Sequence, residues 1–364
     1  MSFKMPVYTA PDFSQQAYKD MPNACWIPAP ANGVAPDDYH ATTIFPEYFK
    51  INGSWQLARE SRMDCVAVLS RGVIEVKEFR RLKKGALVAV GRSEDGSNGI
   101  YVHATAFTQP ESQGEESFAF RQGRSRETAY AMDYDSIYDL LRYEKEHGGH
   151  ITWVLGPACC FDWDARHAFA KLVHGGYVQA VLAGNALATH DLEAGYRSTA
   201  LGQDIYTQIS QPGGHYNHID TINQVRKAGS IEKFVAEQNI QDGIMAACVQ
   251  CKVPYVLTGS IRDDGPLPEV YADVYEGQNA MRDQVKKSTT VICLATTLHS
   301  IATGNMTPSY RVLADGTVRP VYFYSVDVSE FAVNKLRDRG SLAVKTIVTN
   351  VQDFIVNVQR GLSL

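Results

Sequence analysis

Short, almost wholly apolar runs recur through the second half of the chain, and segments with helical periodicity separate them. The runs cover residues 151–155, 177–183, 253–258, 290–295, 320–326 and 343–348. A strand that is apolar on both faces needs cover on both faces, which parallel sheets receive from helices. This pattern predicts an α/β domain built on a parallel sheet.

The first half of the chain follows a different pattern. Its apolar residues alternate in bursts at 65–69, 73–79, 86–90 and 100–107, which predicts a small antiparallel sheet. Residues 1–60 are rich in proline and aromatic residues, and we expect them to wrap the surface. A helical pattern begins near Asp133 and should stop at Gly148 and Gly149. We therefore predict a small β-rich α+β domain over 1–148 and an α/β domain over 149–364.

The charge balance narrows the range of partners. The net charge is −5 and the pI is about 6.1, so there is no basic excess for binding a nucleic acid or an anionic membrane. The basic group at 80–84 is predicted to be a solvated turn. No stretch reaches the ~18 apolar residues of a membrane span, and the N-terminus does not resemble a signal peptide. We therefore expect a cytoplasmic protein whose 7 cysteines are reduced.

Ligands of open parallel sheets bind beyond the carboxyl ends of the strands, so the loops that follow the apolar runs are candidate sites. Gly156 and Pro157 form a small-residue turn that would let the backbone approach a phosphate, although a plain tight turn explains them equally well. Asp162 should cap the next helix. The following loop begins with Asn185 and Ala186, which we assign to cofactor binding because the amide of Asn185 both donates and accepts hydrogen bonds.

Titratable side chains follow in the same segment at His190, Asp191 and Glu193. A histidine beside carboxylates is a candidate for acid/base catalysis. The alternative is that the acidic residues only complement the dipole of a helix N-terminus.

The loop at 258–268 contains an arginine and adjacent carboxylates, and it is stiffened by prolines. Charged residues on a rigid loop favour a functional interpretation. Arg262 is predicted to bind a substrate carboxylate, and Asp263 or Asp264 to bind a cationic amine or a ribose hydroxyl. Of this pair, we place Asp263 with the catalytic residues and Asp264 with the cofactor. A structural ion pair within the loop is the alternative.

Further candidates follow the apolar runs at 290–295 and 320–326. Thr296, Leu298, His299 and Ser300 open a helix and are available to a phosphate or a nicotinamide. Asp327 is the first polar residue after its run. An acid at a strand tip suits the hydroxyls of an adenine ribose and disfavours the 2′-phosphate of NADP.

No metal site is predicted. Cys248 and Cys251 have C-x-x-C spacing, but they fall in a helix that Asp242 should cap, and no second pair follows. We expect buried cysteines there. His215 and His218 have no evident third ligand and are expected at a helix start or in the substrate pocket.

Longer motifs carry a family resemblance. They are Leu182-Ala-Gly-Asn-Ala-Leu-Ala-Thr-His-Asp-Leu-Glu193, Arg226-Lys-Ala-Gly-Ser-Ile231, Gly259-Ser-Ile-Arg-Asp-Asp-Gly-Pro-Leu-Pro268, Leu298-His-Ser-Ile-Ala-Thr-Gly-Asn-Met306 and Val34-Ala-Pro-Asp-Asp-Tyr-His-Ala-Thr-Thr43. Together they resemble the archaeal-type ornithine cyclodeaminases, the C-terminal part of the cyanobacterial arginine dihydrolase/ornithine cyclodeaminases, and relatives of lysine-ketoglutarate reductase/saccharopine dehydrogenase. The resemblance covers essentially the whole chain and is densest in its second half.

The resemblance implies a Rossmann-like NAD-binding domain of the deoxyhypusine-synthase-like type, a homo-oligomer, and an NAD that is recycled within each turnover. Hydride transfer to NAD would oxidise ornithine to an imine, the δ-amine would attack it, ammonia would leave, and the hydride would return to give proline. A base is needed, for which His190, Asp191, Glu193 and Asp264 are candidates, and Arg262 is the first choice for holding the α-carboxylate. Water must be excluded, which the N-terminal domain would achieve by covering the strand ends.

The chain departs from the family pattern near the N-terminus. Where the family continues Asn-His-Pro-Thr, this chain has Ile44-Phe-Pro-Glu47, which would make the pocket more apolar. An insertion at 313–318 resembles a hairpin turn. We predict NAD-dependent cyclodeamination of ornithine or a related diamino acid. The alternative is an NAD-dependent oxidoreductase acting on an amino acid or a saccharopine-like secondary amine. A regulatory nucleotide-binding module is a third possibility, against which the titratable residues argue.

Overall fold

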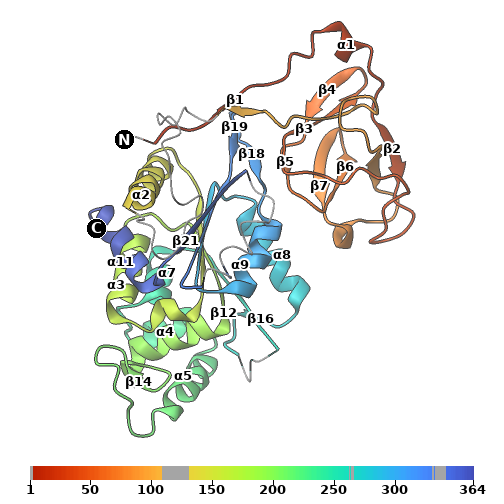
Figure 1. Ribbon diagram of the computed structural model, residues 1–364. Coiled ribbons are helices and arrows are strands. Elements are labelled where there is room, and N and C mark those ends of the chain that lie inside the picture. Colours follow the sequence, from red (N-terminus) through yellow and green to blue (C-terminus); the bar gives the residue numbers. More distant parts are fainter. Residues whose placement is uncertain (1–2, 109–130, 262, 264–265, 330–331, 333–341) are drawn as a thin grey trace.

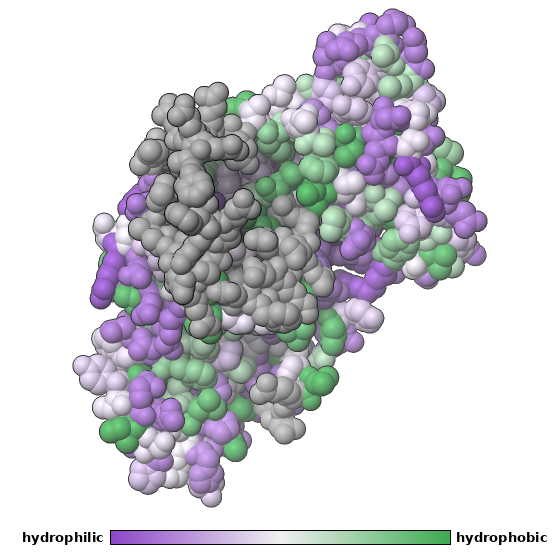
Figure 2. Space-filling view, in the orientation of Figure 1, coloured by the Kyte–Doolittle hydropathy of each residue, from purple (hydrophilic) through white to green (hydrophobic). Residues whose placement is uncertain are grey.

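The computed structural model describes residues 3–108, 131–261, 263, 266–329, 332 and 342–364. A group of small sheets from the N-terminal region lies beside a larger α/β body (Figure 1). On the face shown in Figure 2, hydrophilic residues dominate toward the ends of the molecule, and hydrophobic residues gather where the two parts meet. None of the described helices has the length and apolar character needed to cross a membrane.

A parallel sheet forms the centre of the body, with the strand order β16-β15-β12-β11-β17-β20-β21. Its strands are β11 (Ile151–Leu155), β12 (Ala180–Gly184), β15 (Tyr255–Thr258), β16 (Val270–Tyr271), β17 (Thr290–Leu294), β20 (Tyr322–Asp327) and β21 (Ala343–Val348). Every predicted apolar run contains or borders one of these strands, so the parallel sheet is confirmed. The short edge strand β16 was not predicted.

Helices cover both faces of this sheet (Figure 1). The described helices of the body are α2 (Ala131–Glu146), α3 (Trp163–His174), α4 (Asn185–Arg197), α5 (His215–Ala228), α6 (Ile231–Glu237), α7 (Ile244–Cys251), α8 (Val274–Val285), α9 (Thr297–Met306) and α11 (Val351–Gly361). Of these, α5 packs on α4 and α6, and α6 packs on α5 and α7. Neighbouring residues of β11 face opposite layers: Trp153 packs with α3, α4, α7 and α11, whereas Val154 packs with α8 and α9. This alternation explains why the strands are apolar throughout.

Local signals account for several helix boundaries. Asp162 caps α3 as predicted, since its carboxylate accepts a hydrogen bond from the backbone N–H of Ala165 at 2.8 Å. α2 ends at Glu146, just before the predicted stop, and Gly148 takes a φ of 67°. The expected cap of α7 by Asp242 is wrong, because Gly243 occupies the N-cap position. Beyond α4, β13 (Thr199–Ala200) and β14 (Gln203–Asp204) form a small hairpin before α5.

The N-terminal region contains several antiparallel sheets. β2 (Cys25–Pro28), β8 (Leu87–Val90), β6 (Val66–Ser70) and β7 (Val73–Lys77) form one sheet, β4 (Ser54–Leu57), β3 (Glu47–Ile51) and β9 (Ile100–Val102) form another, and β1 (Val7–Tyr8) pairs with β10 (Phe107–Thr108). The short helix α1 (Gln16–Lys19) and the turn η1 (Phe79–Arg81) complete the region.

The expectation that residues 1–60 wrap the surface is wrong for 47–51, because β3 is a buried central strand, whereas most of the described residues before it are exposed or half-buried. Phe49 is fully buried in it, and the polar residues beside Phe49 are buried with partners. Glu47 lies 3.1 Å from a ring nitrogen of His40, and Lys50 Nζ donates to backbone carbonyls at the end of α1. The sequence analysis missed this strand because a search for apolar runs does not detect polar residues that are buried with partners elsewhere in the chain.

The N-terminal region joins the body through a shared hairpin. The predicted turn at 313–318 connects β18 (Tyr310–Val312) to β19 (Val318–Pro320), and β18 pairs with β5 (Glu60–Ser61). Arg62 donates to the carbonyl of Met306 at the end of α9, at 3.1 Å. Arg80 donates to the side chains of Gln278 and Asn279 on α8, so this basic residue bridges the two parts and does not belong to a purely solvated turn.

This junction lies at the amino ends of the parallel strands, because β20 begins directly after the hairpin. The N-terminal region therefore sits at the opposite edge of the sheet from the carboxyl ends (Figure 1). Among the described residues of one chain, the N-terminal region does not cover those ends, so the prediction is wrong for this part of the region.

Helix α2 is fixed to the same body by a buried ion pair. Glu144 holds Arg319 of β19 through both oxygens, at 2.6 and 3.0 Å. The hydroxyls of Thr289 and Thr290 donate to the same carboxylate at 2.9 and 2.7 Å. All of these groups are buried, so α2, β17 and the hairpin are fastened together at the amino edge of the sheet.

Candidate active site

The carboxyl ends of the central strands form a level row. Gly184 at the end of β12 pairs with Thr258 at the end of β15, and the registers of the neighbouring strands place Gly156, Ala295 and Asp327 in the same row. Adjacent strands lie about 4.8 Å apart, so the row spans roughly 19 Å. The strand order reverses between β11 and β17, the position where sheets of this kind bind ligands.

The loops after β11 and β17 touch at this reversal. A Cβ on Gly156 would overlap the carbonyl oxygen of Ala295, so only glycine fits. Ala295 itself takes the left-handed conformation, with a φ of 50°. Pro157 begins the short turn η2 (Pro157–Cys160), which leads into α3. Gly156 and Pro157 thus lie at the predicted ligand edge, where close backbone packing already explains the glycine.

A pocket of about 550 Å³ opens beside the row, between α4 and α5. It is lined by Asn185, Ala186, Thr189, His190, Leu201, His218, Ile219, Ile222, Asn223, Arg226 and Asp263. Four of the residues predicted for the site are among them: Asn185, Ala186, His190 and Asp263. The pocket therefore joins groups from separate predicted loops in one place.

His190 is held in the pocket wall by Glu193, one turn further along α4. The Nδ1 of His190 lies 3.1 Å from the carboxylate of Glu193. The same carboxylate accepts hydrogen bonds from the hydroxyl of Thr199 and from the backbone N–H groups of Leu201 and Gly202, at 2.8 to 3.0 Å. Burial alone would raise the pKa of Glu193, but these hydrogen bonds hold it below its ordinary value. Glu193 is therefore a fixed, fully buried anion that orients the histidine ring.

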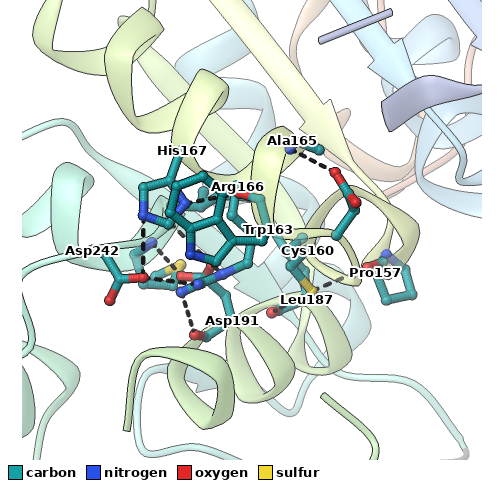
Figure 3. A network of polar contacts seen from close by, with 12 residues as sticks. Pro157, Cys160, Trp163, Ala165, Arg166, His167, Leu187, Asp191 and Asp242 are labelled. Carbon is teal, nitrogen blue, oxygen red and sulfur yellow. Dashed lines mark hydrogen bonds and ion pairs between the residues drawn. The ribbon is translucent and has the colours of Figure 1, made fainter. Parts of the chain in front are cut away.

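Asp191 lies on the opposite side of α4 and faces the protein interior (Figure 3). Its carboxylate pairs with Arg166 of α3 at 2.9 Å and accepts the backbone N–H groups of Ile244 and Met245 at 3.1 and 2.7 Å. Arg166 also pairs with Asp242 at 3.0 Å. Asp191 is 1% exposed and both of its oxygens are occupied, so it joins α3, α4 and α7 and has no access to the pocket.

The loop after β15 reaches the pocket through Asp263. Its carboxylate accepts the backbone N–H of Ser260 at 2.7 Å, and its side chain lines the pocket wall. Asn185 ties the end of this loop to α4, because its side-chain oxygen accepts the N–H of Leu267 at 3.0 Å. Arg262 and Asp264, predicted for the same loop, lie outside the described residues.

The residues after β17 separate into different environments. His299 shares a hydrogen bond of 2.6 Å with Thr258, and burial lowers its pKa while the nearby carboxylate of Asp263 acts in the opposite direction. Thr296 lies 3.4 Å from the other ring nitrogen of His299. Leu298 is 72% exposed on the first turn of α9, whereas Ser300 is buried beneath it. His299 thus bridges strand tips, whereas the buried Ser300 hydroxyl hydrogen-bonds the Cys293 thiol.

Asp327 is the last residue of β20, as predicted for an acid at a strand tip. One of its carboxylate oxygens accepts the backbone N–H of Ser329 at 2.9 Å. This turn fixes the direction of the side chain beside the loop that opens α9.

The sequence prediction missed the α5 wall of the pocket. Ile219, Ile222, Asn223 and Arg226 recur at intervals of 3 and 4 positions on this helix, which places them on one face. The periodicity was available in the sequence, but nothing in it indicated that this face meets α4. His218 both lies in the first turn of α5 and lines the pocket.

Ile44 and Phe45, which differ from the family pattern, do not line the pocket between α4 and α5. Phe45 lines a second cavity of about 300 Å³, together with Pro46, Phe107 and Tyr322, at the junction with the N-terminal region. The expectation that Ile44 and Phe45 shape the substrate pocket is therefore wrong for the pocket described here.

The cysteines of the C-x-x-C spacing are separated by burial. Cys248 is buried in the core, whereas Cys251 is exposed and lies 3.1 Å from a ring nitrogen of His174. The expectation that both are buried is therefore half wrong. Among the described residues, no group of three or more histidine, cysteine or acidic side chains is arranged to hold a metal ion.

The chain is similar to a known protein family and to curated relatives. A family model described as the C-terminal Rossmann fold of arginine dihydrolase ArgZ-like proteins matches residues 135–358. The chain is 38% identical over 338 residues to the ornithine cyclodeaminase of Methanocaldococcus jannaschii, a match that covers 90% of this chain and 75% of the relative.

Solved structures give the same picture. A conserved LOR/SDH protein of Methanococcus maripaludis is 36% identical with a TM-score of 0.84, and the match covers 94% of this chain and 99% of that chain. The ternary complex of AgrE with ornithine and NAD+ is 32% identical with a TM-score of 0.59, and the match covers 94% of this chain and 46% of that chain. This chain therefore corresponds to about half of the AgrE chain.

Proposed function

This chain belongs to the enzyme family of archaeal ornithine cyclodeaminases and ArgZ-like C-terminal Rossmann domains, and from that premise we propose that it converts L-ornithine to L-proline and ammonia with NAD as a catalytic cofactor. The reaction class is a lyase, since one ammonia leaves and no net oxidation occurs. The observation that carries this proposal is the His190–Glu193 pair, in which His190 lines a pocket beside the strand ends.

The strand ends fit a dinucleotide. α3, α6, α8 and α11 each begin with a residue whose side chain caps the first turn, whereas the N-cap residues of α4, α5, α7 and α9 make no such hydrogen bond in the described part of the chain. Of these helices, α4 and α9 begin at the row of strand ends, after Gly184 and Thr296. Free N–H groups at these N-termini suit the pyrophosphate, and Asp327 suits the adenine ribose. NAD, when bound, supplies a two-electron acceptor that can be restored within the same turnover.

His190 is the proposed proton-transfer residue. Because the carboxylate of Glu193 can only accept a hydrogen bond, it selects the tautomer that carries the proton on Nδ1 and leaves Nε2 as a base toward the pocket. Glu193 is the positioning residue. Asp191 is omitted from this role because Arg166 and α7 occupy its carboxylate.

Asp263 is the proposed partner of a substrate amine, since it is an acidic residue of the pocket wall. Asn185 and Ala186 are proposed to border the nicotinamide, because they form the pocket edge nearest the strand tips. The role assigned from the sequence to Asp264, as cofactor ligand, remains part of the proposal, and Arg262 remains a candidate for binding the substrate carboxylate.

One experiment separates this proposal from the alternative. The purified protein is denatured and the released nucleotide is identified, and the intact protein is incubated with L-ornithine without added NAD. Stoichiometric NAD together with proline and ammonia supports the cyclodeaminase. Consumption of added NAD with an amino acid or a saccharopine-like secondary amine supports the oxidoreductase. A protein that holds no NAD and forms no proline contradicts the proposal.

A homo-oligomer and a cytoplasmic location are also proposed. Large apolar side chains are exposed around the pocket at Leu201, Tyr206, Ile209, Tyr216 and Ile219, and a second copy would cover them and exclude water from the pocket. Light scattering after size-exclusion chromatography tests this directly, and a monomer that forms proline contradicts it.

Two domains with a boundary at 148/149 were predicted from the sequence. Because α2 packs against α11, we propose that the boundary of the folding units lies before α2. Limited proteolysis followed by mass spectrometry tests this placement, since cleavage between α2 and β11 would support the predicted boundary instead.

A further inference from the structure

The α5 wall of the pocket is rigidly placed against α4. The amide of Asn217 donates to the hydroxyl of Thr199 at 2.9 Å, and Thr199 in turn donates to Glu193. Val225 is fully buried on the inner side of α5, and the helix ends at Gly229 with a φ of 88°. These contacts fix the position of α5 relative to α4, which carries His190.

Arg226 is the cationic side chain of this face. In the described residues it has no ion pair, whereas nearby arginines are engaged: Arg197 lies 3.7 Å from Asp220 on the outer side of α5, and Arg166 is held by Asp191. Glu193, the buried carboxylate that contacts His190, already accepts four hydrogen bonds. Arg226 lines the pocket, is exposed, and makes no ion pair with a described residue, so its guanidinium is available to an anionic ligand.

The pocket therefore carries charges of opposite sign on different segments of its wall. Its other titratable groups are His190 and His218, whose ring centroids lie 6.0 Å apart, and Asp263 on the loop after β15. A positive group on α5 and a negative group on the loop match a ligand that carries both a carboxylate and an ammonium. The apolar side chains of Ile219 and Ile222 lie on the same helix face as Arg226 and suit a short methylene chain.

We propose that Arg226 is the carboxylate-binding residue of the pocket and that it orients an α-amino acid with its carboxylate toward α5 and its amines toward His190 and Asp263. A guanidinium presents two parallel N–H groups to a carboxylate, which fixes direction as well as affinity. Asn223, one turn earlier, adds an amide donor at the same edge. This inference rests on the proposed function, because it names the residue that selects amino acids as substrates.

The test compares L-ornithine with 1,4-diaminobutane, which has the same amines without the carboxylate. Calorimetric titration of the NAD-loaded protein should show that Arg226→Met weakens ornithine binding by about 10- to 100-fold and leaves diaminobutane binding unchanged. Arg226→Lys should recover part of the loss, since it retains the charge but not the two-pronged geometry. In turnover, KM for ornithine should rise more than kcat falls.

Lys227→Met is the matched control, because Lys227 is the adjacent exposed cation of α5 and does not line the pocket.

The outcomes separate this inference from the proposed function. A wild-type protein that binds ornithine more tightly than diaminobutane but forms no proline would refute the proposed reaction, and a loss of that preference in Arg226→Met would still support the carboxylate assignment. If Arg226→Met binds ornithine as well as the wild type does, the carboxylate assignment is overturned whether or not proline forms. A wild type that does not distinguish ornithine from diaminobutane also overturns it.

Discussion

Glu193 lies 3.1 Å from Nδ1 of His190, and its remaining hydrogen-bonding positions are filled by Thr199 and the backbone N–H groups of Leu201 and Gly202. The carboxylate therefore cannot turn toward a ligand, and its effect on chemistry must pass through the imidazole. This relationship divides the acidic candidates of α4 into an orienting residue, Glu193, and a structural residue, Asp191.

His190→Gln should lower kcat by about 10²- to 10⁴-fold, the usual contribution of a positioned acid/base group. NAD content and melting temperature should stay close to those of the wild type, because the ring faces the pocket. His215→Gln is the control, since His215 is an exposed histidine of the neighbouring helix that does not line the pocket. Full activity in His190→Gln would remove the histidine from the mechanism.

Glu193→Gln should destabilise the protein by about 1–3 kcal/mol at pH 7, because an amide nitrogen would face hydrogen-bond donors in a buried site. The pKa of Glu193 in the folded protein lies below its ordinary value, so its stabilising effect is complete above the unfolded pKa of about 4.3 and is lost as pH falls through the folded pKa. The difference between the two proteins should therefore shrink below about pH 4.3. Urea titrations at several pH values measure this stability difference. A difference that grows on acidification contradicts the assignment of Glu193 as a buried anion.

Asp191→Asn should cost about 3–5 kcal/mol of stability, because Arg166 would remain buried without its main counter-charge. Replacing Arg166 by methionine in the same protein should recover part of that loss, whereas a catalytic role would not respond to the second substitution. Thermal unfolding of the wild type, the single variants and the double variant gives the free energies for this double-mutant cycle. An Asp191→Asn protein of wild-type stability but without activity would return Asp191 to the catalytic candidates.

Asp327→Ala should weaken NAD binding more than it alters substrate choice, because the carboxylate at the strand tip is proposed to hold the adenine ribose. Asp315→Ala, in the exposed turn between β18 and β19, is the control. Fluorescence titration with NAD compares the two, and equal NAD affinity in Asp327→Ala and wild type would reject the ribose assignment.

His150 should make stability depend on pH in the acidic range. Burial, followed by repulsion from Lys287 and Arg311, lowers its pKa to about 4. The unfolded chain binds a proton at about pH 6.5 while the folded chain does not, so stability is greatest above that pH and falls as the pH drops toward the folded pKa. His150→Phe should flatten the dependence of unfolding free energy on pH between about 4 and 6.5. An unchanged slope in this variant would show that other groups are responsible.

The parallel sheet could be predicted because its signals are local. An apolar run such as 290–295, or an aspartate before a helix such as Asp162, acts within a few positions. The buried strand β3 could not be predicted in this way, since Glu47 and Lys50 are polar and become compatible with burial only through partners elsewhere in the chain.

The candidate site shows the same division. His190, Asp191 and Glu193 were recognised together as titratable residues, yet a helix turns by about 100° per residue, so the first and last share a face and the middle one does not. Which face meets the pocket depended on Arg166, 25 positions away, which draws Asp191 into the interior.

The sequence by itself determined the parallel sheet, the loops at its carboxyl ends and the residue types in those loops, because apolar periodicity, caps and glycine turns are short-range properties. Only the tertiary structure decided that α5 forms the second wall of the pocket and that the N-terminal region lies at the opposite edge of the sheet. Both follow from packing between segments that are distant in sequence, such as β5 against β18, and no local pattern encodes which surfaces meet.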